Sequence, residues 1–381
     1  MHGLSLTRLA AGATLMAACA AAQAAVTFEL VAHVNPYPGP SRYADVWGDG
    51  NYAYVGSFSG SGVGIFDLSV PASTFLAGFY NPASGGQFKD VKVSNGIGYF
   101  ASDNGGGLHI VDVSNPAAPT LLSQVTSTQG GYDSIHNVSL AGKYLYQADS
   151  HTPTVKVFDI SNPAAPTFVR DIVTTDLSFI HDTTAIGNRL YTSGFGGKTD
   201  IYDTSLIATQ APLLLGAFTS GSNSHSNWPD ASGNLLASAR ETADGDVRLY
   251  DISNPAAPVL RASITAASLG ISAFSPHNPI IVGNRLYVSW YQAGLQVIDI
   301  QDPSNPVLIG SFDTFAGPVS GFDGNWGVYP LLGADRVLLS DLDGGLYIIN
   351  TAVPEPAAWA LFGLGGTLFA GLGALRRRQR G

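Results

Sequence analysis

The chain has 381 residues, of which 45 are glycine, 22 are proline and only 12% are charged, against about 25% in an ordinary soluble domain. This composition excludes a coiled coil and an acidic disordered chain, and glycines without a three-residue period exclude collagen. Five of the 18 basic and one of the 28 acidic residues lie in the terminal segments 1–24 and 353–381, which leaves 13 and 27, a net charge of −14. Such an acidic body excludes nucleic acid as a partner, because nucleic-acid binding needs a basic surface.

The N-terminal segment has the pattern of a secretory signal peptide. Arg8 precedes an apolar stretch over residues 9–22, and Ala22-Gln23-Ala24 has the small residues of a cleavage site, so cleavage is expected after Ala24. The single cysteine, Cys19, lies in this segment, so the mature chain is expected to have neither a disulfide nor a thiolate metal site. A lipoprotein processing site at Cys19 is the alternative.

The C-terminal segment joins a short motif, nineteen uncharged residues and a basic cluster, which are Pro354-Glu355-Pro356, residues 357–375 and Arg376-Arg377-Arg378. The apolar run predicts a transmembrane helix, and the arginines are expected to stay on the cytoplasmic side, which places the body of the chain outside. This arrangement resembles the PEP-CTERM sorting signal of Gram-negative bacteria. The resemblance implies processing by an exosortase near residues 354–356, a transient membrane anchor, and release or attachment at the cell surface or in the extracellular matrix. A permanent single-pass anchor with the same topology is the alternative.

Between these ends, one short motif recurs seven times. Its copies are marked by Asp67, Asp112, Asp159, Asp203, Asp251, Asp299 and Asn350, which lie 44 to 51 residues apart. Repeats of this length indicate one supersecondary unit per repeat, packed side by side around a shared core. The aspartates suggest either a ring of carboxylates or turn-forming residues, and we predict the turn role, because an Asp just ahead of Ser-Asn-Pro accepts hydrogen bonds from nearby backbone N–H groups.

Each unit carries four strand signals, such as residues 144–146 ahead of the motif and residues 166–172 after the Ser-Asn-Pro-Ala-Ala-Pro turn. Four short strands per unit are typical of a propeller blade. The seventh unit lacks its outer strand, whereas residues 26–31 resemble residues 166–171, so the N-terminal strand is expected to close the last blade. The prediction is an all-β, seven-bladed β-propeller over residues 25–352, between a signal peptide at 1–24 and a sorting segment at 353–381.

Residues 107–116, Gly-Leu-His-Ile-Val-Asp-Val-Ser-Asn-Pro, and residues 294–300, Gly-Leu-Gln-Val-Ile-Asp-Ile, resemble the LVIVD-repeat family of propeller-like surface proteins. The resemblance covers nearly the whole mature chain. It departs at residues 204–206, where the proline turn is absent, and at Asn350. It implies a fold and a surface location rather than a reaction.

A second set of polar residues lies about six residues ahead of the turn that precedes the aromatic strand: Asp45, Asp90, His136, His181, His277 and, with one or two inserted residues, His225. The innermost strand of a blade lines the central channel, so these positions are expected to form a ring near one mouth. Imidazole and carboxylate groups are ligands of Zn, Mn or Fe, and a partly open site activates water. The alternative is that these side chains satisfy backbone groups and ordered water in the channel wall.

Trp47, Trp228 and Trp326 lie close in sequence to the same inner strands. Flat aromatic faces near a channel mouth stack on sugar rings, which suits an exported matrix protein. Packing between blades is the commoner use of such a tryptophan and is the alternative.

Two functions are consistent with these features. The preferred hypothesis is a non-enzymatic scaffold at the cell surface that binds a protein or an exopolysaccharide through its loops. The second is a metal-dependent hydrolase or lyase that uses the His/Asp ring, with a divalent metal as its cofactor. Apart from this ring, the sequence carries no motif that predicts a catalytic residue.

Overall fold

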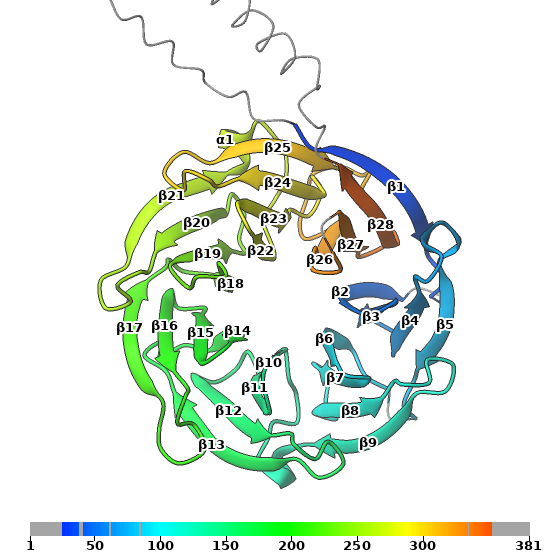
Figure 1. The fold of residues 1–381 in the computed structure, drawn as a ribbon, viewed down its shortest axis with the longest axis vertical. Coiled ribbons are helices and arrows are strands. Elements are labelled where there is room, and N and C mark those ends of the chain that lie inside the picture. Colours follow the sequence, from blue (N-terminus) through cyan, green and yellow to red (C-terminus); the bar gives the residue numbers. More distant parts are fainter. Residues whose placement is uncertain (1–24, 38–40, 61, 84, 334, 353–381) are drawn as a thin grey trace, which may run out of the picture. The chain divides into compact units, whose positions relative to one another are not determined.

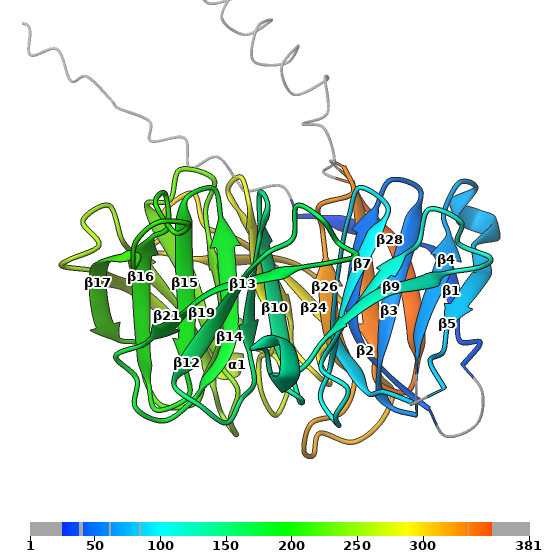
Figure 2. The ribbon, with the colours of Figure 1, turned by 90° about the horizontal axis from the view of Figure 1, so that it is seen from below.

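A computed structural model describes residues 25–37, 41–60, 62–83, 85–333 and 335–352. These residues form seven four-stranded antiparallel sheets, arranged as blades around a central axis (Figure 1). Seen from the side, the strands run from one face of the ring to the other (Figure 2). The prediction of an all-β, seven-bladed propeller is confirmed.

Each of the first six blades consists of four consecutive strands, which follow one another from the channel outwards. Blade 1 contains β2 (Arg42–Asp49), β3 (Tyr52–Ser59), β4 (Val63–Asp67) and β5 (Phe75–Tyr80). Blade 2 contains β6 (Phe88–Ser94), β7 (Ile97–Ser102), β8 (Leu108–Asp112) and β9 (Thr120–Val125). Blade 3 contains β10 (Asn137–Ala141), β11 (Tyr144–Ala148), β12 (Thr154–Asp159) and β13 (Thr167–Val173).

The next three blades repeat this order. Blade 4 contains β14 (Ile180–Ile186), β15 (Arg189–Gly194), β16 (Lys198–Asp203) and β17 (Leu213–Thr219). Blade 5 contains β18 (Ser224–Pro229), β19 (Leu235–Arg240), β20 (Asp246–Asp251) and β21 (Val259–Thr265). Blade 6 contains β22 (Pro279–Val282), β23 (Arg285–Ser289), β24 (Leu295–Asp299) and β25 (Val307–Phe312).

Blade 7 joins the two ends of the described chain. It contains β26 (Asn325–Tyr329), β27 (Arg336–Asp341) and β28 (Gly345–Ala352), and its outer strand is β1 (Thr27–Val34). β1 pairs antiparallel with β28, from Thr27 opposite Ala352 to Val34 opposite Leu346. The N-terminal strand therefore closes the ring, as predicted, and covers an edge that would otherwise offer unpaired backbone groups.

Helical structure in the described residues is limited to α1 (Ala266–Leu269) and the 3-10 turns η1 (Pro71–Ser73) and η2 (Ser127–Gln129). None of these is long and apolar enough to cross a membrane. The predicted transmembrane segment 357–375 lies outside the described residues, together with Ala24, the Pro354-Glu355-Pro356 motif and the arginine cluster at 376–378.

The core lies between neighbouring blades. In the motif strand β8, Ile110 packs with Val138 of blade 3, whereas the next residue, Val111, packs with Ile65 of blade 1. Because successive side chains of a strand point to opposite faces, burial of both faces requires a continuous apolar run. This requirement explains the aliphatic residues ahead of each repeated aspartate.

The repeated aspartates form turns, as predicted. The Oδ1 atoms of Asp67, Asp112, Asp159, Asp203, Asp251 and Asp299 each accept a hydrogen bond from the backbone N–H two residues later, at 2.7 to 3.0 Å. The proline turn that follows also contacts the preceding blade. The Ser123 hydroxyl of blade 2 donates to the Pro163 carbonyl of blade 3 at 2.6 Å. The motif thus forms a strand end and a joint between blades.

Candidate functional site at the channel mouth

Seven residues, one from each blade, lie at the start of the innermost strands. In β6 the pairing with β7 passes from Phe88 directly to Asp90, so Lys89 is an extra, bulged residue. His181, His225 and Trp326 are bulged in the same way in β14, β18 and β26. Side chains of a strand normally alternate between the two faces of the sheet, and a bulge breaks this alternation. The side chain of the extra residue is thereby directed to the channel mouth. We call these positions the mouth residues: Ala44, Lys89, His136, His181, His225, His277 and Trp326.

His136 and His277 precede their strands and hold the same position. The His136 N–H donates to the Ala148 carbonyl at 3.0 Å, and the His277 N–H donates to the Ser289 carbonyl at 2.9 Å. His225 also fits the expected alignment, because six residues separate the paired Pro229 and Leu236 of blade 5, whereas four separate the equivalent pair Ala185 and Leu190 of blade 4. All four predicted histidines therefore occupy equivalent positions.

Asp45 and Asp90 do not share this position, and the predicted alignment is off by one residue for both. The equivalents of the histidines are Ala44 and Lys89. In blade 2 the tight turn begins at Asn95, with φ +55°, and its glycine comes second, whereas Gly142 and Gly187 come first in theirs. Because Asn tolerates positive φ, counting back from the glycine shifts the alignment of blade 2 by one residue.

Asp45 and Asp90 instead connect blades. Asp90 Oδ2 accepts a hydrogen bond from the Val138 N–H of blade 3 at 2.7 Å. Lys92 forms ion pairs with Asp90 and, at 2.9 Å, with Asp45. Burial raises the pKa of Asp90 well above its ordinary value, although the charge of Lys92 opposes this. Both carboxylates line the channel but lie outside the histidine clusters.

The mouth residues of blades 3 to 7 form a continuous row of ring contacts, edge-to-face between His136 and His181 and tilted between the others. The ring centroids of His136 and His181 are 4.2 Å apart, those of His181 and His225 are 4.1 Å apart, and those of His225 and His277 are 4.3 Å apart. Trp326 continues this row, with its ring centroid 4.1 Å from that of His277. Such spacing brings imidazoles from four separate blades into one cluster.

Three carboxylates that the sequence analysis missed accompany the histidines. Asp182 follows His181 in β14, Asp103 lies directly after β7, and Glu241 lies directly after β19. Asp103 and Glu241 come from the loops between the second and third strands of their blades. The only sequence signal for them is their place after the second strand, and that signal becomes useful once the register of the sheets is known.

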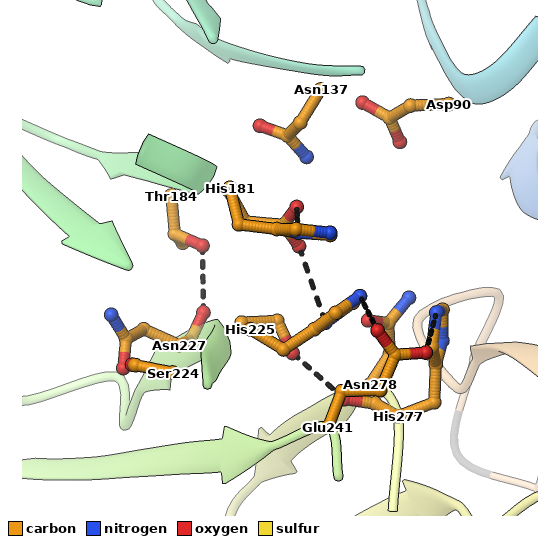
Figure 3. Close-up of polar contacts among 12 residues, drawn as sticks. Asp90, Asn137, His181, Thr184, Ser224, His225, Asn227, Glu241, His277 and Asn278 are labelled. Carbon is orange, nitrogen blue, oxygen red and sulfur yellow. Dashed lines mark hydrogen bonds and ion pairs between the residues drawn. The ribbon is translucent and has the colours of Figure 1, made fainter. Parts of the chain in front are cut away.

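Glu241 lies between His225 and His277 (Figure 3). Its Oε2 is 3.5 Å from His225 Nε2, and its Oε1 is 3.9 Å from His277 Nε2. The Tyr291 hydroxyl donates a hydrogen bond to Glu241 Oε1. His277 Nδ1 lies 2.7 Å from the Trp326 carbonyl, which only accepts, so Nδ1 carries the proton and Nε2 keeps its lone pair facing Glu241.

His136, His181 and Asp182 occupy the other side of His225. His181 Nδ1 is 2.9 Å from Asp182 Oδ1, and Asp182 Oδ2 is 3.9 Å from His225 Nδ1. His136 Nδ1 is 3.4 Å from Asp103 Oδ2, which also pairs with Lys89 Nζ at 2.6 Å. His225 thus has one carboxylate near each of its two nitrogens.

Burial and charge hold three of the four imidazoles in the neutral form. Burial lowers the pKa of His277, and burial followed by the charge of His181 lowers the pKa of His136. The pKa of His225 is lowered most strongly, by burial and then by the charges of its histidine neighbours. Burial also lowers the pKa of His181, but the hydrogen bond and charge of Asp182 outweigh it, so that this pKa is raised.

The arrangement suits a divalent transition metal. One ligand atom from each of His225, Glu241 and His277 lies within 4.8 Å of the others, and the same holds for His136, His181, Asp182 and His225. Metal–nitrogen bonds of about 2.0–2.1 Å in a tetrahedral site place ligand atoms about 3.4 Å apart. The 3.5 Å and 3.9 Å separations around Glu241 are close to this value.

A cavity of about 130 Å³ lies in the channel beside His136, Asp182, His225 and His277. Pockets that hold drug-sized ligands measure about 300–1,000 Å³, so this cavity suits an ion with its water or a small molecule rather than a polymer chain.

The three predicted tryptophans line the same cavity but occupy two levels of it. Trp47 and Trp228 are equivalent residues near the far ends of their inner strands, where both pack against the apolar cores between blades. The indole N–H of Trp47 donates to the Val93 carbonyl at 3.0 Å. Trp326 is buried against His277 and Phe58. These contacts match the packing role, and stacking on sugars stays a prediction.

Comparisons with known proteins agree with this architecture. The LVIVD repeat model matches residues 42–82, 85–127, 134–174, 243–266 and 280–314, which lie in blades 1, 2, 3, 5 and 6. No curated protein matches the sequence. Among solved structures, the crystal structure of the computationally designed Ika8 protein is similar over 82% of this chain and 97% of that chain, with a TM-score of 0.56 and 12% identity. This likeness supports the fold alone.

The PEP-CTERM protein-sorting motif matches residues 352–378. The motif implies processing by an exosortase, export and association with the surface of a Gram-negative bacterium. Together with the repeats and the seven blades, it establishes the family. The chain is an LVIVD-repeat β-propeller protein with a C-terminal PEP-CTERM sorting motif.

Proposed function

We propose that this propeller binds a divalent transition-metal ion at its channel mouth through His225, Glu241 and His277. One observation carries the proposal. Both ring nitrogens of His225 and Nε2 of His277 are buried and make no hydrogen bond within the described residues. A buried polar group without a partner costs about 1–3 kcal/mol, and an ion coordinated by Nε2 of His225 and Nε2 of His277 removes that cost for these two atoms.

Charge supports the same conclusion. The Glu241 side chain is only 15% exposed, and in the described part of the chain no lysine or arginine forms an ion pair with it. At the equivalent place in blade 2, Lys89 neutralises Asp103 at 2.6 Å. A buried carboxylate needs a positive partner, and His225 and His277 are held neutral. A bound cation supplies the missing charge.

The chemistry of such a site is hydrolytic. Two imidazoles and one carboxylate are the protein ligands of many catalytic zinc sites, in which a water molecule takes the fourth position. Coordination lowers the pKa of that water to about 7 and provides a nucleophile at neutral pH. The adjoining cavity of about 130 Å³ limits the substrate to a small molecule. We therefore place the metal-dependent hydrolase ahead of the scaffold that the sequence analysis preferred.

Metal titration tests the proposal directly. The purified protein is stripped with a chelator and titrated with Zn²⁺ or Co²⁺, with calorimetry and elemental analysis as readouts. We expect tight binding that falls at least about 100-fold in Glu241→Gln, which keeps the shape of the side chain but removes its charge. Asp90→Asn is the matched control, because it changes a buried carboxylate of the same channel outside the clusters. Equal binding by wild type and Glu241→Gln would contradict the proposal.

A surface observation favours the scaffold as a second candidate function. The outermost strands of six blades carry an exposed apolar side chain at their first or second residue: Phe75, Leu121, Phe168, Leu213, Val259 and Val307. Repeated apolar residues on an acidic rim are a contact surface for a partner at the cell surface. Leu213→Glu is expected to weaken retention of the protein in isolated envelopes while metal binding stays unchanged. Unchanged retention of Leu213→Glu would contradict a role of these outer-strand residues in binding a partner.

A further inference from the structure

His225 belongs to both ligand sets at the channel mouth. It shares one set with His136, His181 and Asp182, and the other with Glu241 and His277. Its Nδ1 lies 3.9 Å from Asp182 Oδ2, and its Nε2 lies 3.5 Å from Glu241 Oε2. The two nitrogens of one buried imidazole therefore face two different groups of ligands.

We propose that the channel mouth holds two divalent transition-metal ions, bridged by His225 as an imidazolate. The inference rests on the proposed function, which supplies the first ion at Nε2 of His225, Glu241 and His277. The second ion takes Nδ1 of His225 together with His136, His181 and Asp182. Blades 5 and 6 hold the first ion, blades 3, 4 and 5 hold the second, and His225 of blade 5 belongs to both sets.

The absence of hydrogen bonds at His225 points to two ions rather than one. A buried histidine that ligates one metal ordinarily donates its other N–H to a carboxylate or a carbonyl. His277 follows this rule through the Trp326 carbonyl, at 2.7 Å. His225 does not, because neither of its nitrogens has a hydrogen-bond partner among the described residues, although its side chain is only 3% exposed. A second ion provides the partner for Nδ1.

The charges of the second set are also compatible with a cation. Asp182 is buried, and its nearest positive partner is His181, at 2.9 Å. In the described residues no lysine or arginine forms an ion pair with Asp182. An ion coordinated by Asp182 replaces the proton that the His181 and Asp182 pair otherwise shares.

Asp103 is the positioning residue of the second set. It lies 3.4 Å from Nδ1 of His136 and is held by Lys89 at 2.6 Å. A carboxylate that accepts the Nδ1 proton leaves Nε2 of His136 as the ligand atom and fixes the orientation of the ring. Lys89 supports this arrangement because it keeps Asp103 ionised.

Bridging by His225 requires the loss of its N–H proton. A neutral imidazole carries one N–H, so both nitrogens of His225 ligate metal only after that proton leaves. The second ion takes the place of the proton, which is released to the solvent. Binding of the second ion therefore releases more protons than binding of the first, and its affinity rises more steeply with pH.

The test uses the purified protein, stripped with a chelator and loaded with Cu²⁺. Elemental analysis is expected to give two ions per chain. Electron paramagnetic resonance is expected to show a magnetically coupled pair, because an imidazolate transmits coupling between the two ions. Glu241→Gln and Asp182→Asn should each retain one ion with an uncoupled signal, and Asp90→Asn should retain the coupled pair. Asp103→Asn should lower the affinity for the second ion by about 10- to 100-fold.

The outcomes separate this inference from the proposed function. A single ion that Glu241→Gln loses and Asp182→Asn keeps overturns the second site but supports the proposed function. Two ions without coupling overturn the bridge. No bound ion in the folded wild type overturns both proposals. Circular dichroism of each variant confirms that lost binding does not reflect unfolding, and Asp182→Asn and Glu241→Gln keep the volumes of the side chains they replace.

Discussion

Asp103 and Glu241 hold the same position in blades 2 and 5, each directly after the second strand of its blade. The Asp103 N–H donates to the Gln87 carbonyl at 2.9 Å, and the Glu241 N–H donates to the Asn223 carbonyl at 3.0 Å, two residues before the mouth residue in both blades. Each carboxylate also lies between the mouth residue of its own blade and that of the next. One partner of Asp103 is a lysine, whereas both partners of Glu241 are imidazoles.

The stability of the metal-free protein is expected to fall as the pH drops below about 6.5. The pKa of His225 is lowered by burial. At mildly acidic pH this histidine is therefore protonated in the unfolded chain but not in the folded protein. One such group contributes at most about 1.4 kcal/mol per pH unit. Urea unfolding in chelator at pH 7, 6 and 5 measures this slope. The His225→Gln variant should show a smaller slope, and an identical slope would contradict the assignment.

At lower pH, Asp103 is expected to control a second loss of stability. Burial alone would raise the pKa of Asp103, but His136 and Lys89 outweigh it and hold the pKa at about 2. A folded pKa below the unfolded value of about 3.9 stabilises the protein above that value, and the contribution disappears as the pH falls towards 2. Acid unfolding followed by circular dichroism should show this step in the wild type and a smaller one in Asp103→Asn.

Metal binding should raise the melting temperature. An ion that binds only the folded protein adds about 2.7 kcal/mol of stability at a free concentration of 100 times its Kd. Calorimetry with and without Zn²⁺ is expected to show this shift in the wild type and in Asp90→Asn. In Glu241→Gln the shift should be smaller, because this variant loses the ion that Glu241 binds. A wild-type melting temperature that does not respond to Zn²⁺, Co²⁺ or Mn²⁺ would contradict the proposed metal site.

Gly78→Ala should destabilise the joint between blades 1 and 2. A Cβ atom at Gly78 would lie 1.7 Å from the Pro116 carbonyl oxygen, and a backbone atom has little freedom to move away. Overpacking of this kind costs about 3 kcal/mol. Ala262 holds the equivalent position in blade 5, so Ala262→Gly serves as the comparison and should cost no more than about 1 kcal/mol. Denaturant unfolding of both variants measures the difference.

Removal of residues 25–34 should open the ring. These residues include the whole of β1, whose pairing closes blade 7, and Val26, whose N–H donates to the Ile309 carbonyl at 2.8 Å. Their loss leaves β28 as an unpaired edge, which promotes aggregation. We expect the melting temperature to fall by about 10 °C or more, which corresponds to several kcal/mol. A truncated chain that stays monomeric and melts like the wild type would show that β1 is dispensable.

The sequence by itself determined the seven blades, the closing strand and the turn role of the repeated aspartates. These features depend on local patterns, namely apolar runs buried on both faces and an Asp just ahead of the turn residues, and every blade repeats them. The same regularity placed His136, His181, His225 and His277 at one end of the channel, because equivalent residues of a propeller lie at equivalent heights.

Only the tertiary structure decided which other residues join the histidines. A single bulge puts Lys89 rather than Asp90 at the channel mouth, and a one-residue bulge leaves no mark in the apolar pattern of a strand. Glu241 meets His277, 36 residues later in the chain, through the curvature of the ring and the path of one loop. Both contacts depend on how neighbouring blades pack against each other, which the pattern within a single repeat does not encode.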